Sequence, residues 1–427
     1  MNILLLGSGG REHAIAHSIQ KSKKLKQLYI SPGNPGTALC GTNVKPELKT
    51  VSEIKAFCLA EAIDCIVVGP EVPLINGIYD QMKMDPDTAH IAVIGPSQQG
   101  AMLEGSKDFA KQFMEKYRIP TAAYKTFTKE NVYEGFKFID SLKAPYVLKA
   151  DGPAAGKGVL IIDDADDAKR ELAAMVSENK FGDSGNKVVI EQFLKGIECS
   201  YFVATDGRNF ILLPNAKDYK RIGEGDSGLN TGGMGAVSPV PFADDVLTQK
   251  ILKQIVEPTV KGLQQEDIIY KGFIYVGLMI VGGEPFVIEY NCRLGDPETE
   301  VILPRMESDI IDLFDAIENE SLDSFQLKID PRAACTVVLA SQGYPEHYPT
   351  GFTISGLDSV KNSIVFHAGT KKDGNRYLTA GGRVLAVTSF GKNLREALRN
   401  SYLSIDEISF DGKYCRNDIG FDVQLDA

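Results

Sequence analysis

Short apolar runs that end in glycine and proline recur along the first part of the chain. Four of them predict buried strands, at residues 3–6, 28–31, 65–69 and 91–95. Buried parallel strands read as short apolar runs, and the loops at their carboxyl ends carry Gly and Pro. Helical spacing from Glu12 to about Lys21 separates the first two runs. We therefore expect residues 1–103 to form an open parallel α/β domain with ligand loops at the carboxyl ends of its strands.

The pattern changes after Gly105, where helices alternate with strands in mixed order. Helical spacing predicts helices at residues 107–117, 131–142, 164–178, 245–266 and near 299–318. Alternating or apolar runs predict strands at residues 146–150, 158–162, 187–192, 198–205 and 209–213, and a hairpin of 273–281 with 285–291 around Gly282-Gly283. We expect a central α+β domain at residues 104–327.

Strand patterns predominate again from about residue 330. They predict strands at residues 335–340, 364–367 and 382–388, with a helix at about 393–404. We expect residues 328–427 to form a C-terminal β-rich domain. The chain as a whole is then of the α/β class, in three domains.

Composition excludes several classes of protein. The 427 residues are 43% hydrophobic and 24% charged, which is typical of a globular chain. A net charge of −11 disfavours general binding to nucleic acid or to anionic membranes. No apolar run reaches the roughly 18 residues that span a bilayer. The 7 cysteines are scattered without a C-x-x-C pair, which argues against zinc sites and disulfides and predicts a reducing cytoplasm.

The first glycine-rich loop, Gly7 to His13, follows a strand and opens a helix. It is similar to the dinucleotide fingerprint G-x-G-x-x-G, but Glu12 replaces the third glycine. The second strand ends without the acidic residue that would hold a ribose hydroxyl, so both features argue against an NAD-dependent dehydrogenase. A phosphate or a substrate could still bind at this turn. The alternative is a tight turn with a purely structural role.

A second glycine-rich loop, Gly152 to Gly158, fails as a P-loop. Its spacing is one residue short, and Gly158 stands where a Ser or Thr would bind magnesium. It joins two strands, so we expect a flap whose Lys157 reaches nucleotide phosphates, or else a plain hairpin loop. A third segment, residues 228–236, is expected to be a loop that orders around a ligand or stays a mobile surface loop.

The strand Val287 to Arg293 carries the sharpest chemical signal. Side chains alternate along a strand, so Glu289, Asn291 and Arg293 share one face. Carboxylate and amide oxygens suit magnesium, which takes one or two carboxylates together with substrate phosphates. An adjacent arginine suits a carboxylate or a phosphate. The alternative is a solvated strand face, but the following Leu294–Glu298 adds a glycine turn and two more carboxylates.

Other residues suited to a nucleotide lie before this strand. Lys149 ends one predicted strand, and Lys107 opens a helix. Glu191 and Glu198 bracket Phe193-Leu194, which together could offer acceptors and an apolar wall to adenine and ribose. The alternative for each is an ordinary solvated side chain.

Taken together, these motifs resemble the ATP-grasp superfamily, and more closely the phosphoribosylamine–glycine ligase (glycinamide ribonucleotide synthetase) family. The resemblance covers essentially the whole chain. Its motifs are Gly7-x-Gly9-Gly10-Arg11-Glu12-His13, Pro32-Gly33-Asn34-Pro35-Gly36, Gly69-Pro70-Glu71, Leu103-Glu104-Gly105-Ser106-Lys107, Lys149-Ala150-Asp151-Gly152, Ala155-Gly156-Lys157-Gly158, Asn230-Thr231-Gly232-Gly233-Met234-Gly235, Glu289 to Glu298, and His367-Ala368-Gly369-Thr370.

The resemblance implies the second step of purine biosynthesis. Glycine, ATP and 5-phosphoribosylamine would give glycinamide ribonucleotide, ADP and phosphate through glycyl phosphate. It also implies ATP and Mg²⁺ (or Mn²⁺) as cofactors, a pre-ATP-grasp N-terminal domain, a mobile lid at about residues 122–193, and a monomer without nucleic-acid or membrane partners.

The resemblance also assigns roles to residues. Magnesium would bind Glu289 and Asn291. The ATP phosphates would bind Lys107, Lys149, Gly156, Lys157 and Gly158, and adenosine would bind Glu191, Phe193, Leu194 and Glu198. Asp218 would hold the ammonium of glycine and Arg293 its carboxylate, as the catalytic pair. The other substrate-binding residues would be Gly9, Gly10, Gly33 and Asn34 near the ribose phosphate, with Gly295 and Asp296.

Two positions depart from the family pattern, and three alternatives stay open. Pro153 stands where an apolar non-proline residue is expected, and Tyr219 where a histidine is expected after Asp218. The nearest alternative is another ATP-grasp carboxylate–amine ligase or a carboxylase of purine biosynthesis. The others are the dehydrogenase and a catalytically silent nucleotide sensor, which the Glu289/Asn291 pair disfavours.

Overall fold

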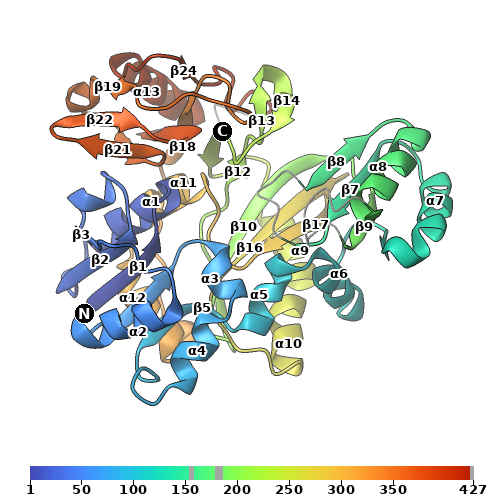
Figure 1. Ribbon diagram of the computed structural model, residues 1–427, viewed down its shortest axis with the longest axis horizontal. Coiled ribbons are helices and arrows are strands. Elements are labelled where there is room, and N and C mark those ends of the chain that lie inside the picture. The colour runs from blue at the N-terminus through green and yellow to red at the C-terminus, as the bar shows by residue number, and fades with distance from the viewer. Residues whose placement is uncertain (153–157, 178–185, 424–427) are drawn as a thin grey trace.

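The computed structural model describes residues 1–152, 158–177 and 186–423 (Figure 1). Its N-terminal part is the expected parallel sheet, with strands in the order β3–β2–β1–β4–β5. Their bounds are β1 Asn2–Gly7, β2 Gln27–Pro32, β3 Thr42–Asn43, β4 Cys65–Val68 and β5 Ala92–Pro96. The apolar residues of β1 are buried because helices cover both faces of the sheet.

Helix α1 (Gly10–Ile19) follows β1 as expected, beginning two residues earlier than the pattern indicated. Four further helices of this part were not predicted: α2 Val51–Ala60, α3 Glu71–Ile75, α4 Ile78–Met84 and α5 Gln98–Gly105. Three of them are short and give little periodicity. Helix α2 did carry a local signal, because Thr50 and Glu53 form a capping box at its start.

The parallel sheet does not end at β5. β5 pairs antiparallel with β16 (Tyr270–Val281), which continues the sheet into β10 (Ile197–Thr205) and β11 (Phe210–Leu212). β17 (Glu284–Asn291) also pairs with β16, so one sheet of 9 strands runs through both parts. The predicted hairpin is confirmed, with φ of 58° at Gly282 and 81° at Gly283 in its turn.

The described residues between 122 and 193 form a small layer of their own, drawn in teal and green at the right of Figure 1. Its antiparallel strands run β6–β9–β7–β8. Their bounds are β6 Tyr124–Phe127, β7 Tyr146–Ala150, β8 Val159–Ile162 and β9 Val188–Gln192, with α7 Val132–Ser141 and α8 Ala165–Ser177 packed on them. We call this layer the lid. α6 (Lys107–Lys116) leads into it from the central part.

The predicted helix at 245–266 is a continuous run of helical turns. It consists of α9 (Asp245–Ile251), a π-helical turn at Leu252–Val256 and α10 (Glu257–Gln265). The prediction near 299–318 corresponds to α11 (Thr299–Arg305) and α12 (Ile310–Glu318).

The C-terminal part is rich in strands, as expected. Its main sheet contains β18 Ala333–Ser341, β20 Ile364–His367, β23 Arg383–Gly391 and β24 Lys413–Tyr414, and a smaller sheet contains β19 Thr353–Ile354, β21 Thr370–Asp373 and β22 Arg376–Thr379. α13 (Leu394–Glu407) packs on β18 and β23. The main sheet also takes β12 (Lys217–Asp218) and β15 (Gly235–Ser238) from an earlier stretch of the chain.

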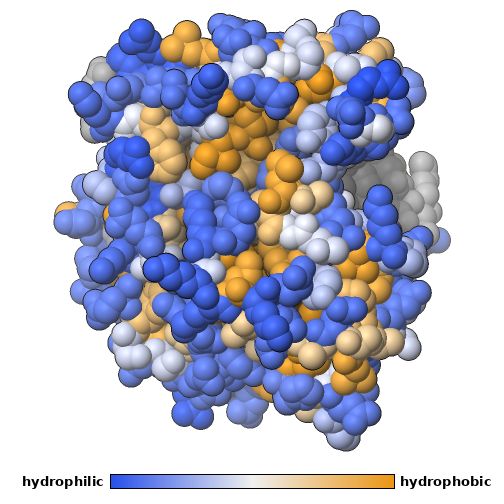
Figure 2. Space-filling view, turned by 90° about the vertical axis from the view of Figure 1, so that its left-hand side faces the viewer, coloured by the Kyte–Doolittle hydropathy of each residue, from blue (hydrophilic) through white to orange (hydrophobic). Residues whose placement is uncertain are grey.

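The expectation that residues 228–236 form a loop is wrong at both ends of the segment. The segment contains most of β14 (Ser227–Asn230), which pairs with β13 (Arg221–Gly223), and the start of β15, where Gly235 pairs with Val337. One strand partner of β15, β18, lies about a hundred residues further along the chain, so local composition gave no sign of that pairing. No helix among the described residues is long and apolar enough to cross a membrane. On the side shown in Figure 2, hydrophilic residues cover most of the surface.

Candidate active site

The end of β17 converges on one carboxylate, that of Glu104 at the end of α5. Arg293 donates from Nη2 to Glu104 Oε1 at 2.7 Å, and the backbone N–H of Cys292 donates to Oε2 at 2.8 Å. The amide nitrogen of Asn291, turned toward Glu104, donates to Oε1 at 2.9 Å. Sequence reasoning missed Glu104, although it lies in the quoted motif before Lys107. This hub fixes the backbone and side chains at the carboxyl end of β17.

Arg293 is therefore only partly available to a substrate. Its Nε lies 3.5 Å from Glu71 and is buried without a hydrogen bond. An unpaired buried donor is costly unless a ligand satisfies it. Nη2 is held by Glu104 and Nη1 donates to the backbone oxygen of Leu294 at 3.3 Å, so Nε is the guanidinium nitrogen without a hydrogen bond.

Glu289 and Asn291 fit the expected magnesium site. Burial acts to raise the pKa of Glu289, but Lys220, Lys149, Lys107 and Arg293 together lower it below its ordinary value. The carboxylate is thus ionised at neutral pH and is 42% exposed. The nitrogen of the Asn291 amide is committed to Glu104, which leaves its oxygen as an acceptor. Such a pair suits magnesium that takes its other ligands from phosphates and water.

The side chain of Glu191 is buried and ion-paired within the protein. It is 2% exposed and forms ion pairs with Lys149 at 2.9 Å and with Lys111 at 3.1 Å. Lys149 also donates to the backbone oxygen of Ile288 at 3.0 Å, which ties the lid strand β7 to β17. The carboxylate therefore positions two lysines. Lys111 was missed, although it follows Lys107 by one helical turn.

The remaining nucleotide candidates differ in how the structure holds them. Lys107 donates to the backbone oxygen of Gly152 at 3.0 Å, and burial lowers its pKa. Phe193 and Leu194 are half-buried, as the side chains of an apolar wall would be. Gly158 is buried and directly precedes β8, whereas Pro153, Gly156 and Lys157 lie outside the described residues.

A cluster of charges lies where β12 meets β10 and β17. Lys220 donates to Glu198 at 2.9 Å and lies 3.5 Å from Glu289. Burial acts to lower the pKa of Lys220, but Asp218 and the two glutamates raise it well above its ordinary value. Lys220 was not predicted, although its place two residues after Asp218 puts both side chains on one side of an extended chain.

Two further carboxylates of this cluster, Asp218 and Glu298, are buried. Burial raises the pKa of Asp218, and it raises that of Glu298 to about 8, with Asp218 adding repulsion. Ser200 donates to Glu298 at 3.3 Å. Tyr219 points to the opposite side, where its hydroxyl donates to Asp422 at 3.0 Å. The departure at Tyr219 therefore lies outside the charged cluster.

Two backbone amides of the loop after β1 are hydrogen-bonded within the protein. Glu12 Oε2 accepts from the backbone N–H of Ser8 at 3.1 Å and of Gly9 at 2.5 Å. A carboxylate thus occupies the place that the missing third glycine would leave open. The replacement of the third glycine by Glu12 therefore has a structural role in this loop, whereas the missing acidic residue after β2 is a separate departure from the dinucleotide motif.

Asn34 is likewise engaged within the protein. Its Nδ2 donates to the backbone oxygens of Ser8 and His367, both at 2.8 Å, and its Oδ1 accepts from Gly36 N at 2.7 Å. The side chain holds the loops after β1, β2 and β20 together. It therefore shapes this part of the predicted substrate site, and Gly33 before it has a φ of 70° that favours glycine.

Asp296 joins this loop group to the end of β17. It pairs with Arg383 at 3.0 Å, and Arg11 N donates to it at 3.4 Å. A Cβ on Gly10 would lie 2.3 Å from Glu300, and a Cβ on Gly295 would lie 2.4 Å from Glu298. The structure thus brings the candidates together as two neighbouring groups, linked by Arg11 donating to the Leu294 oxygen at 3.2 Å.

Comparisons with known proteins cover nearly the whole chain. Models of the phosphoribosylglycinamide synthetase N domain, ATP-grasp (A) domain and C domain match residues 1–104, 105–299 and 334–422. The chain is 43% identical over 426 residues to a phosphoribosylamine–glycine ligase of Vibrio parahaemolyticus, covering 99% of this chain and 98% of the relative.

Solved structures agree with these matches. The crystal structure of a phosphoribosylamine–glycine ligase from Thermotoga maritima superposes with a TM-score of 0.85 at 34% identity, covering 98% of this chain and 100% of that one. A biotin carboxylase from Campylobacter jejuni shares the fold, with a TM-score of 0.70 at 16% identity over 97% of this chain and 92% of that one. The chain therefore belongs to the phosphoribosylglycinamide synthetase family.

Proposed function

We propose that the protein ligates glycine to 5-phosphoribosylamine at the expense of ATP, giving glycinamide ribonucleotide, ADP and phosphate. The observation that carries the proposal is the end of β17, where three lysines and Arg293 act electrostatically on Glu289, and Asn291 shares its face of the strand. Full-length relatives named phosphoribosylamine–glycine ligase support the choice of substrates. The site equips the chain for the second step of purine biosynthesis.

The chemistry needs positioning and charge neutralisation more than a protein nucleophile. A carboxylate oxygen of glycine attacks the γ-phosphorus of ATP, and ADP leaves as glycyl phosphate forms. The amine of phosphoribosylamine then attacks the acyl carbon, phosphate leaves, and the nitrogen loses a proton. Mg²⁺ or Mn²⁺ held by Glu289 and Asn291 would neutralise phosphate charge. Lys107 and Lys149 add positive charge beside the same phosphates.

Substrates are divided between the two groups of residues. We assign the ammonium of glycine to Asp218 and its carboxylate to Arg293 Nε. Adenosine lies against Phe193 and Leu194, with Glu198 as an acceptor, while Glu191 acts by holding Lys111 and Lys149. The loops at Gly9-Gly10 and Gly33-Asn34, with Gly295 and Asp296, shape the side for the ribose phosphate. Proximity of an amine to an acyl phosphate contributes roughly 7–11 kcal/mol to such a step.

We further propose that the chain acts as a monomer in the cytoplasm. All seven cysteines are free, which suits a reducing compartment. Domain boundaries near residues 103 and 328 and a lid that moves over the nucleotide belong to the same proposal. A closing lid would exclude water from a hydrolysable acyl phosphate.

ADP release from Mg–ATP tests the proposal. Glycine and freshly generated phosphoribosylamine are added separately and together, and the product is identified by mass. We expect release to require both, with glycinamide ribonucleotide formed. Release that depends on bicarbonate would instead indicate a carboxylase of the same fold, and ADP release with neither substrate would refute the ligase proposal.

A further inference from the structure

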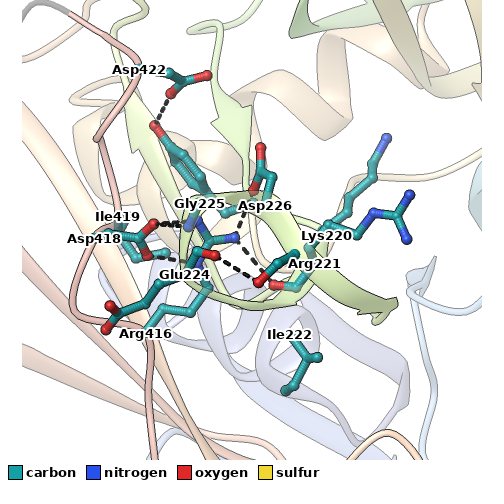
Figure 3. Close-up of polar contacts among 12 residues, drawn as sticks. Lys220, Arg221, Ile222, Glu224, Gly225, Asp226, Arg416, Asp418, Ile419 and Asp422 are labelled. Atoms are coloured by element: carbon teal, nitrogen blue, oxygen red, sulfur yellow. Dashed lines mark hydrogen bonds and ion pairs between the residues drawn. The ribbon is translucent and has the colours of Figure 1, made fainter.

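The C-terminal segment, residues 413–423, contacts the β13–β14 hairpin through one buried arginine, Arg416 (Figure 3). Arg416 is 0% exposed. Its Nη1 donates to the backbone oxygen of Arg221 at 3.1 Å and to Asp226 at 2.7 Å. A fully buried guanidinium stays in the fold only when its donors are paired, and here partners on the hairpin supply part of that pairing.

Asp418 contacts both Arg416 and the turn of the hairpin. It accepts from Arg416 Nε at 2.8 Å and Nη2 at 2.9 Å, and it also accepts from the backbone N–H of Gly225 at 2.7 Å. Tyr414 donates from its hydroxyl to the Ile222 oxygen at 2.7 Å. The segment thus contacts β13 and the turn that follows it, mostly through their backbone groups, and these contacts fix the path of the chain there.

The hairpin has little order of its own. β13 and β14 form an isolated two-stranded sheet whose register is broken between Arg221 and Gly223. Gly225, Asp226 and Gly228 all have positive φ, of 62°, 53° and 78°. Residues 224–229 are exposed. Two-stranded hairpins are marginal in water, so its conformation depends on the contacts from residues 414–418.

The hairpin begins one residue after Lys220, whose side chain points away from Arg416 in Figure 3. Lys220 reaches Glu198 and Glu289 on the other side. Tyr219 points toward the C-terminal segment, with its ring 5.4 Å from the Arg416 guanidinium. Residues 218–221 therefore connect the C-terminal segment directly to the charged cluster of the site.

We propose that Arg416 is a positioning residue for the ligase site. It holds the hairpin so that Lys220 stays between Glu198 and Glu289, beside Asp218. Arg416 touches no reacting atom in this arrangement and acts only through the chain at 219–226. The inference rests on the proposed function, because it assigns its effect to the glycine and nucleotide side of that site.

Substitution of Arg416 by methionine keeps the apolar stem and removes every donor. We expect Arg416→Met to lower kcat/KM for glycine by about tenfold or more, while KM for phosphoribosylamine changes less than about twofold. Arg416→Lys keeps the charge but cannot reach all the partners, so we expect an intermediate loss. Asp226→Asn weakens the contact with Arg416 from the hairpin side, and asparagine tolerates the positive φ at this position. It therefore tests the same contact if Arg416→Met does not fold.

Lys413→Met is the matched control. Lys413 lies in the same segment but donates to Ile405 O at 3.0 Å and Ile408 O at 2.6 Å, at the end of α13. We expect it to lower stability and leave the KM values unchanged. Amide hydrogen exchange should rise at residues 221–230 in Arg416→Met and Asp226→Asn, and stay low there in Lys413→Met.

Each outcome decides the proposal. A loss selective for glycine with faster exchange in the hairpin supports it. Unchanged kinetics in a folded Arg416→Met or Asp226→Asn, or an equal loss in Lys413→Met, overturns it. The wild-type chain in the same assay separates the two hypotheses: if it shows no ADP release dependent on glycine, the proposed function fails, whereas a normal wild type with unaffected variants refutes the positioning role alone.

Discussion

Neighbouring carboxylates of the site differ in charge state because their surroundings differ. Lysines lower the pKa of Glu289 below its ordinary value, despite the opposing effect of burial. Burial and the nearby Asp218 raise the pKa of Glu298 to about 8. An ionised carboxylate suits a metal, and a protonated one can donate a hydrogen bond. The surroundings of each carboxylate thus decide whether it is suited to bind a metal or to donate a hydrogen bond.

Glu289→Gln tests the metal site with little change in shape. Loss of the charge should remove most of the metal affinity, so we expect glycine-dependent ADP release to fall at least about 100-fold. The measurement is steady-state turnover over a range of Mg²⁺ concentrations. Glu284→Gln, on the exposed start of the same strand, should keep near-normal turnover. Near-normal turnover in Glu289→Gln would remove Glu289 from the metal site.

Glu191→Gln probes the buried ion pairs at the lid. Two buried ammonium groups would lose their counter-charge, which typically costs 3–5 kcal/mol. We expect a loss of that order in the free energy of unfolding by urea. Glu257→Gln breaks an exposed pair with Lys261, at 3.6 Å, and should cost at most about 0.5 kcal/mol. Equal losses in the two variants would contradict the structural role of Glu191.

At the scale of elements, loops from three strands pack against one another without room for side chains. The loops follow β1, β2 and β20, and Asn34 ties them together. A Cβ on Gly36 would lie 2.2 Å from the His13 ring and 2.9 Å from His367 Cβ. The small residue at this position is therefore a packing requirement of the junction.

Gly36→Ala should destabilise the protein by about 1–3 kcal/mol, because the rings must shift. Since this junction shapes the predicted ribose-phosphate side, we also expect KM for phosphoribosylamine to rise while KM for ATP is unchanged. Thermal unfolding and initial rates measure the two effects. An equal rise in both KM values would place the junction outside any one substrate site.

At the scale of the whole molecule, the same junction joins the N-terminal and C-terminal parts through buried histidines. The backbone N–H of His367 donates to His13 Nδ1 at 2.8 Å. Burial lowers the pKa of His13 to about 3 and that of His367 to about 4, from 6.5. Both rings are neutral in the fold and protonate in the unfolded chain below pH 6.5. The unfolded state then binds more protons, so stability falls as pH drops from 6.5 toward 4.

His13→Asn keeps an acceptor at this position and removes the titrating ring. We expect the dependence of unfolding free energy on pH between 6 and 4 to become shallower by up to about 1.4 kcal/mol per pH unit. Urea unfolding at several pH values, compared with the unsubstituted chain, gives the difference. An unchanged slope would mean that His13 does not couple pH to stability at this junction.

The amino-acid sequence by itself determined the local elements and the strand face that Glu289 and Asn291 share. Apolar runs and alternation depend on neighbouring residues, so β1, β7, the β16–β17 hairpin and the pair Glu289/Asn291 could be predicted from the pattern. Even the broken fingerprint at Glu12 was visible, though its role as a cap was not.

Only the tertiary structure decided which distant segments form ion pairs, hydrogen bonds and strand pairs with one another. Glu104 meets Cys292 across 188 positions, and Arg416 meets Asp226 across 190. β5 pairs with β16, and β12 and β15 join the C-terminal sheet. The composition of these segments does not indicate which strands they pair with. Such contacts depend on the packing of the whole chain, which is why Glu104, Lys111, Lys220 and Arg416 gave no signal strong enough to be predicted.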